Sequence, residues 1–216
     1  LVGTTACNMS NTGKGALIGG GGGAGLGAGI GALIGGGKGA AIGAGVGAAV
    51  GAGAGALIGN KMDKQKKELE EQLANANVEE TTDANGLKAI KVTFEGGILF
   101  PTNGTTISAS AKNELTKFAN SLKSNPDTDV YVYGFTDNTG KMSVNERIST
   151  ERAKSVLTYL VNQGVASSRV TSQGIAMADY VASNETAEGR AQNRRVEIYI
   201  SANKDMIEKA ENGTLK

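Results

Sequence analysis

Residues 129–153 read DVYVYGFTDNTGKMSVNERISTERA and combine a strand pattern, a polar loop and the start of a helix. The first seven residues alternate apolar and aromatic side chains with others, which is typical of a strand. Thr136 and Asp137 follow in the loop, and Asn145 and Arg152 lie in the predicted helix. Asp137 therefore stands at a strand–helix junction in a chain that contains no histidine.

The composition excludes several classes of function. The formal net charge of +1 gives no general attraction to nucleic acid, and none is expected as a partner. Histidine is absent and Cys7 is the single cysteine, so the commonest general base is missing and no metal site or cofactor is predicted. Hydrolysis would have to use carboxylates alone, and no pair is placed for it. We expect no enzymatic activity.

The sequence around this stretch predicts one α+β domain over residues 87–203. Strand patterns occupy residues 87–96, 97–100, 129–135, 168–176 and 194–201, and helical spacing occupies 108–126 and 143–164. The expected order is β-β-α-β-α-β-loop-β, a mixed sheet with helices on one face. Ser108 or Ser110 is expected to cap the first helix, and Gly164 to end the second.

The N-terminal region is dominated by a tandem repeat of glycine. Residues 13–36 and 37–60 are two copies of 24 residues, and glycine recurs at every fourth position from Gly15 to Gly59. This spacing places the glycines along one helical face, as in GxxxG contacts between membrane helices.

The repeat predicts a transmembrane helical hairpin over residues 13–60. The 22 glycines would cost a helix in water roughly 20 kcal/mol relative to alanine. The two stretches without polar side chains would span about 34 and 31 Å as helices, near the ~30 Å hydrocarbon core, where the backbone must bond to itself. We expect contact with membrane lipid and homo-oligomerisation through the glycine groove. A flexible linker is the alternative.

The segments beside the repeat carry weaker signals. Within residues 1–12, the small-residue run TTAC ends at Cys7 and resembles the end of a lipoprotein signal. It predicts that Cys7 is acylated, and a free thiol is the alternative. Residues 61–86 are highly charged and predict a solvated helical linker. Residues 204–216 are assigned to a C-terminal tail.

Three ordered motifs, GFTDNTGKMSVNERISTERA, NQGVASSRVTSQGIA and SNETAEGRAQNRRVEI, resemble the OmpA-like peptidoglycan-binding domain family over roughly residues 88–201. Together with the glycine repeat, they are similar to the YiaD-like glycine-zipper lipoproteins. The resemblance implies a non-enzymatic domain that holds the diaminopimelate side chain of peptidoglycan, a ligand with an ammonium and a carboxylate on one carbon.

The resemblance also implies the binding residues. Asp137 matches the family's ammonium-binding aspartate, and Arg152 matches its carboxylate-binding arginine; a guanidinium fork suits a carboxylate. The other implied site residues are Asn145 of NERISTERA, Thr136, Asn103 of LFPTNGTTI and Arg194 of NRRVE. The family commonly has histidine where Phe135 stands and an acid where Pro101 stands.

Two hypotheses for the whole chain follow. In the first, a lipoprotein in the outer membrane of a Gram-negative bacterium tethers that membrane to the wall through a periplasmic domain, with Asp137 as a counter-charge. In the second, the glycine hairpin is an oligomeric pore or scaffold, and the wall-binding domain only positions it. The alternative for the single residues is a structural role, with Asp137 in an Asx turn and Arg152 as a buried structural arginine.

Overall fold

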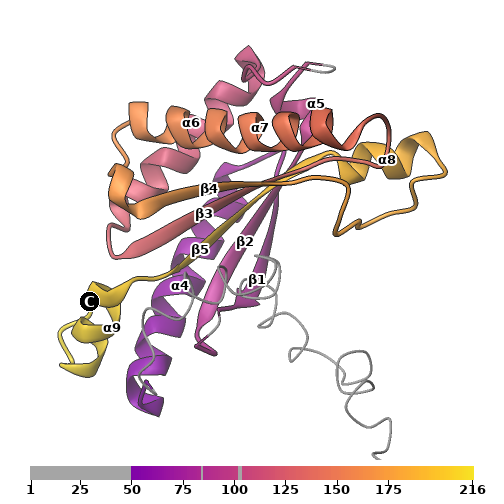
Figure 1. The fold of residues 1–216 in the computed structure, drawn as a ribbon. Coiled ribbons are helices and arrows are strands. Elements are labelled where there is room, and N and C mark those ends of the chain that lie inside the picture. Colours follow the sequence, from indigo (N-terminus) through magenta and orange to yellow (C-terminus); the bar gives the residue numbers. More distant parts are fainter. Residues whose placement is uncertain (1–49, 84, 102–103) are drawn as a thin grey trace, which may run out of the picture.

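A computed structural model describes residues 50–83, 85–101 and 104–216. Within them a five-stranded sheet is covered on one face by helices (Figure 1). The strands are β1 (Asn77–Thr82), β2 (Lys88–Glu95), β3 (Thr128–Phe135), β4 (Val170–Ile175) and β5 (Arg195–Ala202). The helices are α4 (Ala52–Gln72), α5 (Gly96–Leu99), α6 (Ala109–Ser124), α7 (Met142–Asn162), α8 (Ala187–Asn193) and α9 (Lys204–Glu211), with a 3₁₀ turn at Ser167–Arg169.

The sheet is mixed, as predicted. Its order is β1-β2-β5-β3-β4, with β3 and β4 parallel and all other neighbours antiparallel. Alternation along the strands sends one set of apolar side chains to the helix-covered face. This core includes Ile90, Val92, Phe94, Val130, Val132, Val196, Ile198 and Ile200.

Several predicted elements are confirmed. Strands β2, β3, β4 and β5 and helices α6 and α7 lie where the sequence pattern places them. Ser108 caps α6 by accepting a hydrogen bond from the backbone N–H of Ala111. Gly164 follows the end of α7 with a φ of 93°, a left-handed conformation that glycine adopts without strain.

Other predictions are wrong. Residues 97–100, expected as a strand, lie mainly in helix α5, and the fifth strand is β1, which falls within the predicted linker. The loop predicted after β4 contains helix α8, whose N-cap is Thr186. The predicted C-terminal tail contains helix α9, with Met206, Ile207 and Ala210 buried.

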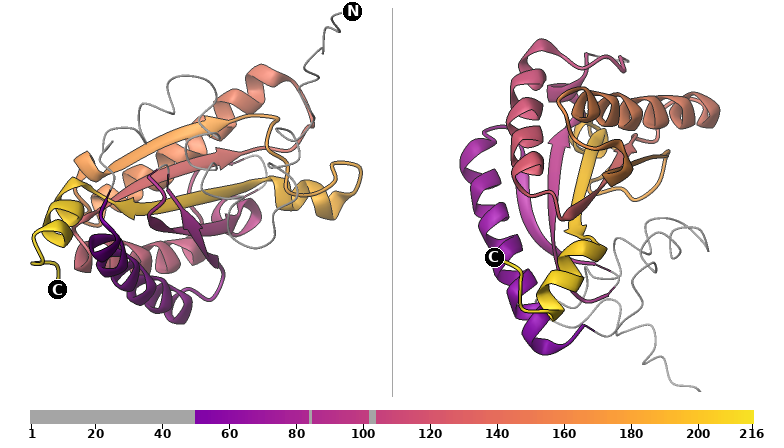
Figure 2. Two further views of the ribbon diagram at one scale, coloured as in Figure 1. Left: turned by 90° about the horizontal axis from the view of Figure 1, so that it is seen from below. Right: turned by 90° about the vertical axis from the view of Figure 1, so that its left-hand side faces the viewer.

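The predicted solvated linker is also wrong, because α4 packs against the domain. It contacts α6, α9, β1 and β2 and lies beside α6 (Figure 2). Met62 and Leu69 of the predicted linker are 1% and 0% exposed. The α4 part of the predicted linker is therefore an amphipathic helix, although its many charged residues suggest a solvated one.

This packing corrects the end of the predicted hairpin. Residues 52–60 belong to its second membrane arm in the prediction, yet they begin α4, where Ala54 and Ile58 are buried in the protein core. Among the described residues, no helix has the length and apolarity to cross a membrane. Residues 13–49 of the predicted hairpin, and Cys7, lie outside the described residues.

Candidate functional site

A cavity of 860 Å³ lies where the loop after β3 meets the first half of α7, α5 and the residue that follows α8. Thr136, Asp137, Asn145, Arg152 and Arg194, all predicted from the sequence, line it together. Asn103 lies outside the described residues. The cavity is also lined by residues that sequence reasoning did not select: Gly96, Gly97, Phe100, Pro101, Thr139, Gly140, Val144, Arg147 and Ile148.

Asp137 is a buried, fixed anion. Its Oδ1 accepts hydrogen bonds from the backbone N–H and hydroxyl of Thr139, at 2.9 and 2.5 Å, and its Oδ2 accepts one from Nη1 of Arg194 at 2.6 Å. Burial raises the pKa of Asp137, but the Thr139 bonds and the Arg194 ion pair outweigh it, and the net pKa is lowered. The Asx turn is therefore present, yet each carboxylate oxygen has about two acceptor sites, so Oδ2 retains one.

Arg152 is a buried cation that has no carboxylate partner in the described part of the chain. The residue is 5% exposed, its Nε donates to the carbonyl oxygen of Gly104 at 3.0 Å, and its guanidinium lies 5.2 Å from the Phe100 ring centroid. Burial and the like charge of Arg194 lower the pKa of Arg152, Asp137 opposes them, and a guanidinium stays charged in any case. Within the described residues, no carboxylate forms an ion pair with it.

Asn145 and Thr136 hold the loop around Asp137. The Nδ2 group of Asn145 donates to the carbonyl oxygens of Thr139 and Lys141, at 2.8 and 3.1 Å. The hydroxyl of Thr136 accepts a hydrogen bond from the backbone N–H of Met177 at 3.0 Å, which ties the β3 loop to the β4 loop. Both contacts position the aspartate.

Two glycines let α7 approach the sheet closely enough to present Arg152. Gly134 of β3 and Gly174 of β4 are paired in register. A Cβ atom at Gly134 would collide with the carbonyl oxygen of Ser149, and one at Gly174 with the backbone N–H of Thr150. The same side of α7 carries Arg152 one turn further on.

As far as the described residues show, the cavity combines the anion Asp137 with the cation Arg152, which has no ion-pair partner. Arg194 is paired with Asp137, and Arg147 is paired with Glu151 at 3.0 Å. Arg152 is left with Gly104 and the face of Phe100. Since buried charges are normally paired, the cavity is suited to a ligand that carries a carboxylate beside a hydrogen-bond donor or ammonium.

These features define a binding domain of mixed α+β architecture with a charged pocket. Residues 99–194 match the OmpA family, and residues 22–66 match a glycine zipper family. The chain thus carries an OmpA family domain preceded by a glycine zipper.

Relatives share much of this sequence. The chain is 42% identical over 143 residues to Probable lipoprotein YiaD of Escherichia coli (strain K12), covering 66% of this chain and 64% of that protein. It is 41% identical over 113 residues to Peptidoglycan-binding protein ArfA of Mycobacterium tuberculosis (strain CDC 1551 / Oshkosh), covering 52% and 35%. The chain thus spans less than two thirds of either relative.

Solved structures share the fold. The cell wall anchor of the T6SS from Pseudomonas aeruginosa superposes with a TM-score of 0.54 at 27% identity, covering 65% of this chain and 96% of that one. A MotB-like protein from Desulfovibrio vulgaris superposes with a TM-score of 0.59 at 20% identity, covering 68% and 98%.

Proposed function

We propose that the domain binds peptidoglycan non-covalently by holding the zwitterionic end of a diaminopimelate side chain. Arg152 binds the ligand carboxylate through its Nη groups, and Asp137 accepts a hydrogen bond from the ligand ammonium. The observation that carries this proposal is the burial of Arg152, without a carboxylate partner in the described residues, in the cavity that Asp137 lines. The names of the mycobacterial peptidoglycan-binding relative and of the Pseudomonas cell wall anchor support the same ligand class.

Diaminopimelate fits this pocket better than lysine at the same position of the stem peptide. Lysine ends in an ammonium alone and leaves Arg152 without an anion. Diaminopimelate adds the carboxylate that an arginine fork binds bidentately, and charge-assisted hydrogen bonds of this kind are about twice as strong as neutral ones.

We propose further that the whole chain is an outer-membrane lipoprotein that tethers the membrane to the wall. Acylation of Cys7 and contact of residues 13–49 with lipid anchor it, and the glycine face associates with copies of the same chain. The match to a glycine zipper family and the name of the Escherichia coli relative, Probable lipoprotein YiaD, support a lipid anchor. Mass spectrometry of the membrane fraction tests the acylation, and cross-linking in detergent tests the oligomer. An unmodified Cys7, or monomer at every concentration, would count against the respective step.

Co-sedimentation of the 216-residue chain with diaminopimelate-containing wall tests the ligand. We expect the unmodified chain to pellet and the Asp137→Asn and Arg152→Ala variants to stay in the supernatant. Glu146→Ala and Lys154→Ala are matched controls and should pellet normally. Both positions are exposed on α7, the helix that carries Arg152, and lie outside the cavity. Circular dichroism checks that each variant is folded, and equal pelleting of all variants would disprove the proposed clamp.

A further inference from the structure

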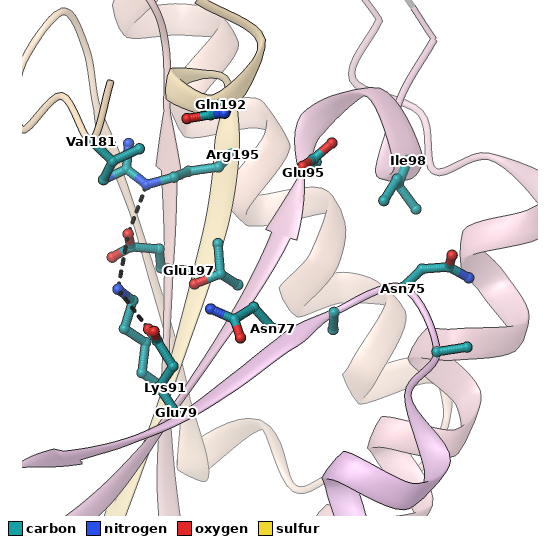
Figure 3. A pocket seen from close by; sticks show the side chains of 13 residues that line it. Asn75, Asn77, Glu79, Lys91, Glu95, Ile98, Val181, Gln192, Arg195 and Glu197 are labelled. Atoms are coloured by element: carbon teal, nitrogen blue, oxygen red, sulfur yellow. Dashed lines mark hydrogen bonds and ion pairs between the residues drawn. The ribbon is translucent and has the colours of Figure 1, made fainter. Parts of the chain in front are cut away.

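A second cavity, of 610 Å³, lies on the sheet face opposite the helix-covered core. Its sheet residues alternate with core residues along β2: Lys91, Thr93 and Glu95 line the cavity, whereas Ile90, Val92 and Phe94 point into the core. Figure 3 shows this cavity between β1, β2, β5 and α5. It is lined by Ala74, Asn75, Ala76, Asn77, Glu79, Lys91, Thr93, Glu95, Ile98, Val181, Gln192, Arg195 and Glu197.

The two cations of this cavity are already neutralised. Nε of Arg195 donates to Oε1 of Glu197 at 2.7 Å, and Lys91 lies between Glu197 and Glu79, at 3.7 and 3.4 Å (Figure 3). Arg195 also donates to the carbonyl oxygen of Asp179, and its guanidinium lies 3.8 Å from the ring centroid of Phe135. Unlike the pocket at Arg152, this cavity presents no unpaired cation among its lining residues and does not suit an anion.

Its remaining polar side chains are three amides, one carboxylate and the hydroxyl of Thr93, whose buried oxygen forms no hydrogen bond within the described residues. The side chains of Asn75, Asn77, Gln192 and Glu95 are exposed, and none forms a hydrogen bond within the described part of the chain. A carboxamide both donates and accepts, and a carboxylate accepts from up to four donors. Such groups suit a neutral ligand with several hydroxyl and amide groups.

Apolar surface completes the cavity. Ala74, Ala76, Ile98 and Val181 contribute to its walls, and Val181 is 55% exposed, unusually high for a large apolar side chain. Sugar rings present C–H faces to apolar side chains and hydroxyl edges to amides, so this mixture of lining groups matches a sugar better than a peptide or a lipid.

The two cavities are neighbours across α5. Gly96 and Gly97 line the cavity at Asp137, whereas Glu95 and Ile98 line the second one. On β5 and the residue before it, Arg194 lines the first and Arg195 the second. One ligand could therefore occupy both if it carried a charged branch beside a neutral sugar.

We propose that the second cavity binds an N-acetylated sugar of the glycan strand whose stem peptide occupies the Asp137 pocket. The inference rests on the proposed function for its source of sugar. Glycan strands of peptidoglycan are built of N-acetylated hexoses, and the stem peptide is attached through an amide, so the sugar portion at that attachment is neutral. Acetamido groups pair with Asn77 and Gln192, and ring hydroxyls with Glu95.

Titration of the ¹⁵N-labelled 216-residue chain in detergent micelles with a tetramer of N-acetylglucosamine tests this site. Amide signals of Asn77, Glu95 and Gln192 should shift, while those of Asp137 and Arg152 stay in place. Asn77→Ala and Gln192→Ala should each weaken the sugar about three- to tenfold, the loss of one or two hydrogen bonds. Asn113→Ala on the exposed side of α6 is the matched control and should bind normally.

Two further arms separate this inference from the proposed function. Arg152→Ala should abolish binding of a free diaminopimelate stem peptide and leave sugar affinity unchanged. Absence of sugar-induced shifts at the second cavity, or equal binding of a glucose tetramer without acetamido groups, overturns the inference even if the wall assay succeeds. Sugar binding without stem-peptide binding overturns the proposed function and leaves the sugar site standing.

Discussion

At the residue scale, Arg194 and Thr139 keep Asp137 ionised below the ordinary aspartate pKa of 3.8. A carboxyl group with a lowered folded-state pKa stabilises the fold above its unfolded pKa, and this contribution is lost as pH falls through the folded value. In the proposed binding mode, the same ionisation provides the counter-charge for a ligand ammonium. We therefore expect wall binding to be constant from about pH 7 down to about pH 5, as measured by co-sedimentation.

Substitution of Arg194 should raise the pH at which wall binding is lost. In Arg194→Ala, Asp137 loses one hydrogen bond and one nearby positive charge, so its pKa rises and binding is lost at a higher pH than in the unmodified chain. The pH midpoint of wall binding is the measurement. Arg147→Ala, which removes a cavity-lining arginine paired with Glu151 instead, is the control. Identical midpoints for all three proteins would contradict the role of Arg194.

The buried pair Arg195–Glu197 gives a second residue-scale prediction. Glu197→Ala leaves a guanidinium that is 4% exposed without its carboxylate and removes the acceptor of the Tyr199 hydroxyl. Breaking a buried pair from one side costs about 3–5 kcal/mol of unfolding free energy. Glu79→Ala removes an ion pair whose carboxylate is 49% exposed and should cost about 1 kcal/mol or less. Urea unfolding measures both, and equal losses would refute the prediction.

Sequence reasoning selects five of the residues that line the pocket, but not the contacts that hold them there. The resemblance to the OmpA-like family implies that Asp137, Asn145 and Arg152 share one site, and all three line the cavity. The ion pair between Asp137 and Arg194 joins positions 57 residues apart, so no local pattern could indicate it. The alternation of side chains along β5 also places Arg195 and Glu197 on the sheet face opposite Val196. Alternation alone would predict that their side chains are exposed to solvent, yet both are buried. Their burial depends on Phe135, Lys91 and Asp179 from other elements.

At the element scale, the approach of α7 to β3 and β4 sets the position of Arg152. Gly134→Ala places a methyl group against the carbonyl oxygen of Ser149, which belongs to the helix backbone and cannot rotate away. We expect a loss of about 1–3 kcal/mol in unfolding free energy, together with weaker wall binding, because α7 must shift.

A glycine in open surroundings provides the control for this substitution. Gly53 lies in α4 with no atom within 4 Å of the added Cβ, so Gly53→Ala should stabilise the chain by about 0.4–1 kcal/mol. Urea unfolding of both variants separates close packing from glycine's general flexibility. A Gly134→Ala variant as stable as the unmodified chain would mean that α7 is not held against the sheet there.

The elements that sequence reasoning missed are short or lack a regular apolar pattern. Strand β1 reads NVEETT and has Val78 as its one large apolar side chain, so its pairing with β2 decides its conformation. Helix α5 has four residues, two of them glycine, which is too short for helical periodicity. Helix α9 did carry usable signals: Asn203 as N-cap, and Met206, Ile207 and Ala210 at helical spacing.

At the scale of the whole molecule, α4 includes residues 52–60 of the glycine repeat and packs directly against the OmpA family domain, without a solvated spacer. A charged helix of residues 61–86 would have extended the chain by about 39 Å at 1.5 Å per residue. Instead the segment folds back as α4 and β1 against α6, α9 and β2. If the proposed tether exists, this packing sets the distance between α4 and the pocket at Asp137.

Two adjacent residues of α4 test whether this packing contributes to stability. Ile58 is 0% exposed and lies in the core, whereas Leu57 is 38% exposed. Ile58→Ala should lower the unfolding free energy of the whole domain by about 2–5 kcal/mol, and Leu57→Ala by less than about 1 kcal/mol. Amide hydrogen exchange gives an independent measurement, since residues 58–69 should be protected to a similar degree as α6. Rapid exchange in α4, with equal stability of the two variants, would restore the solvated spacer and lengthen the tether.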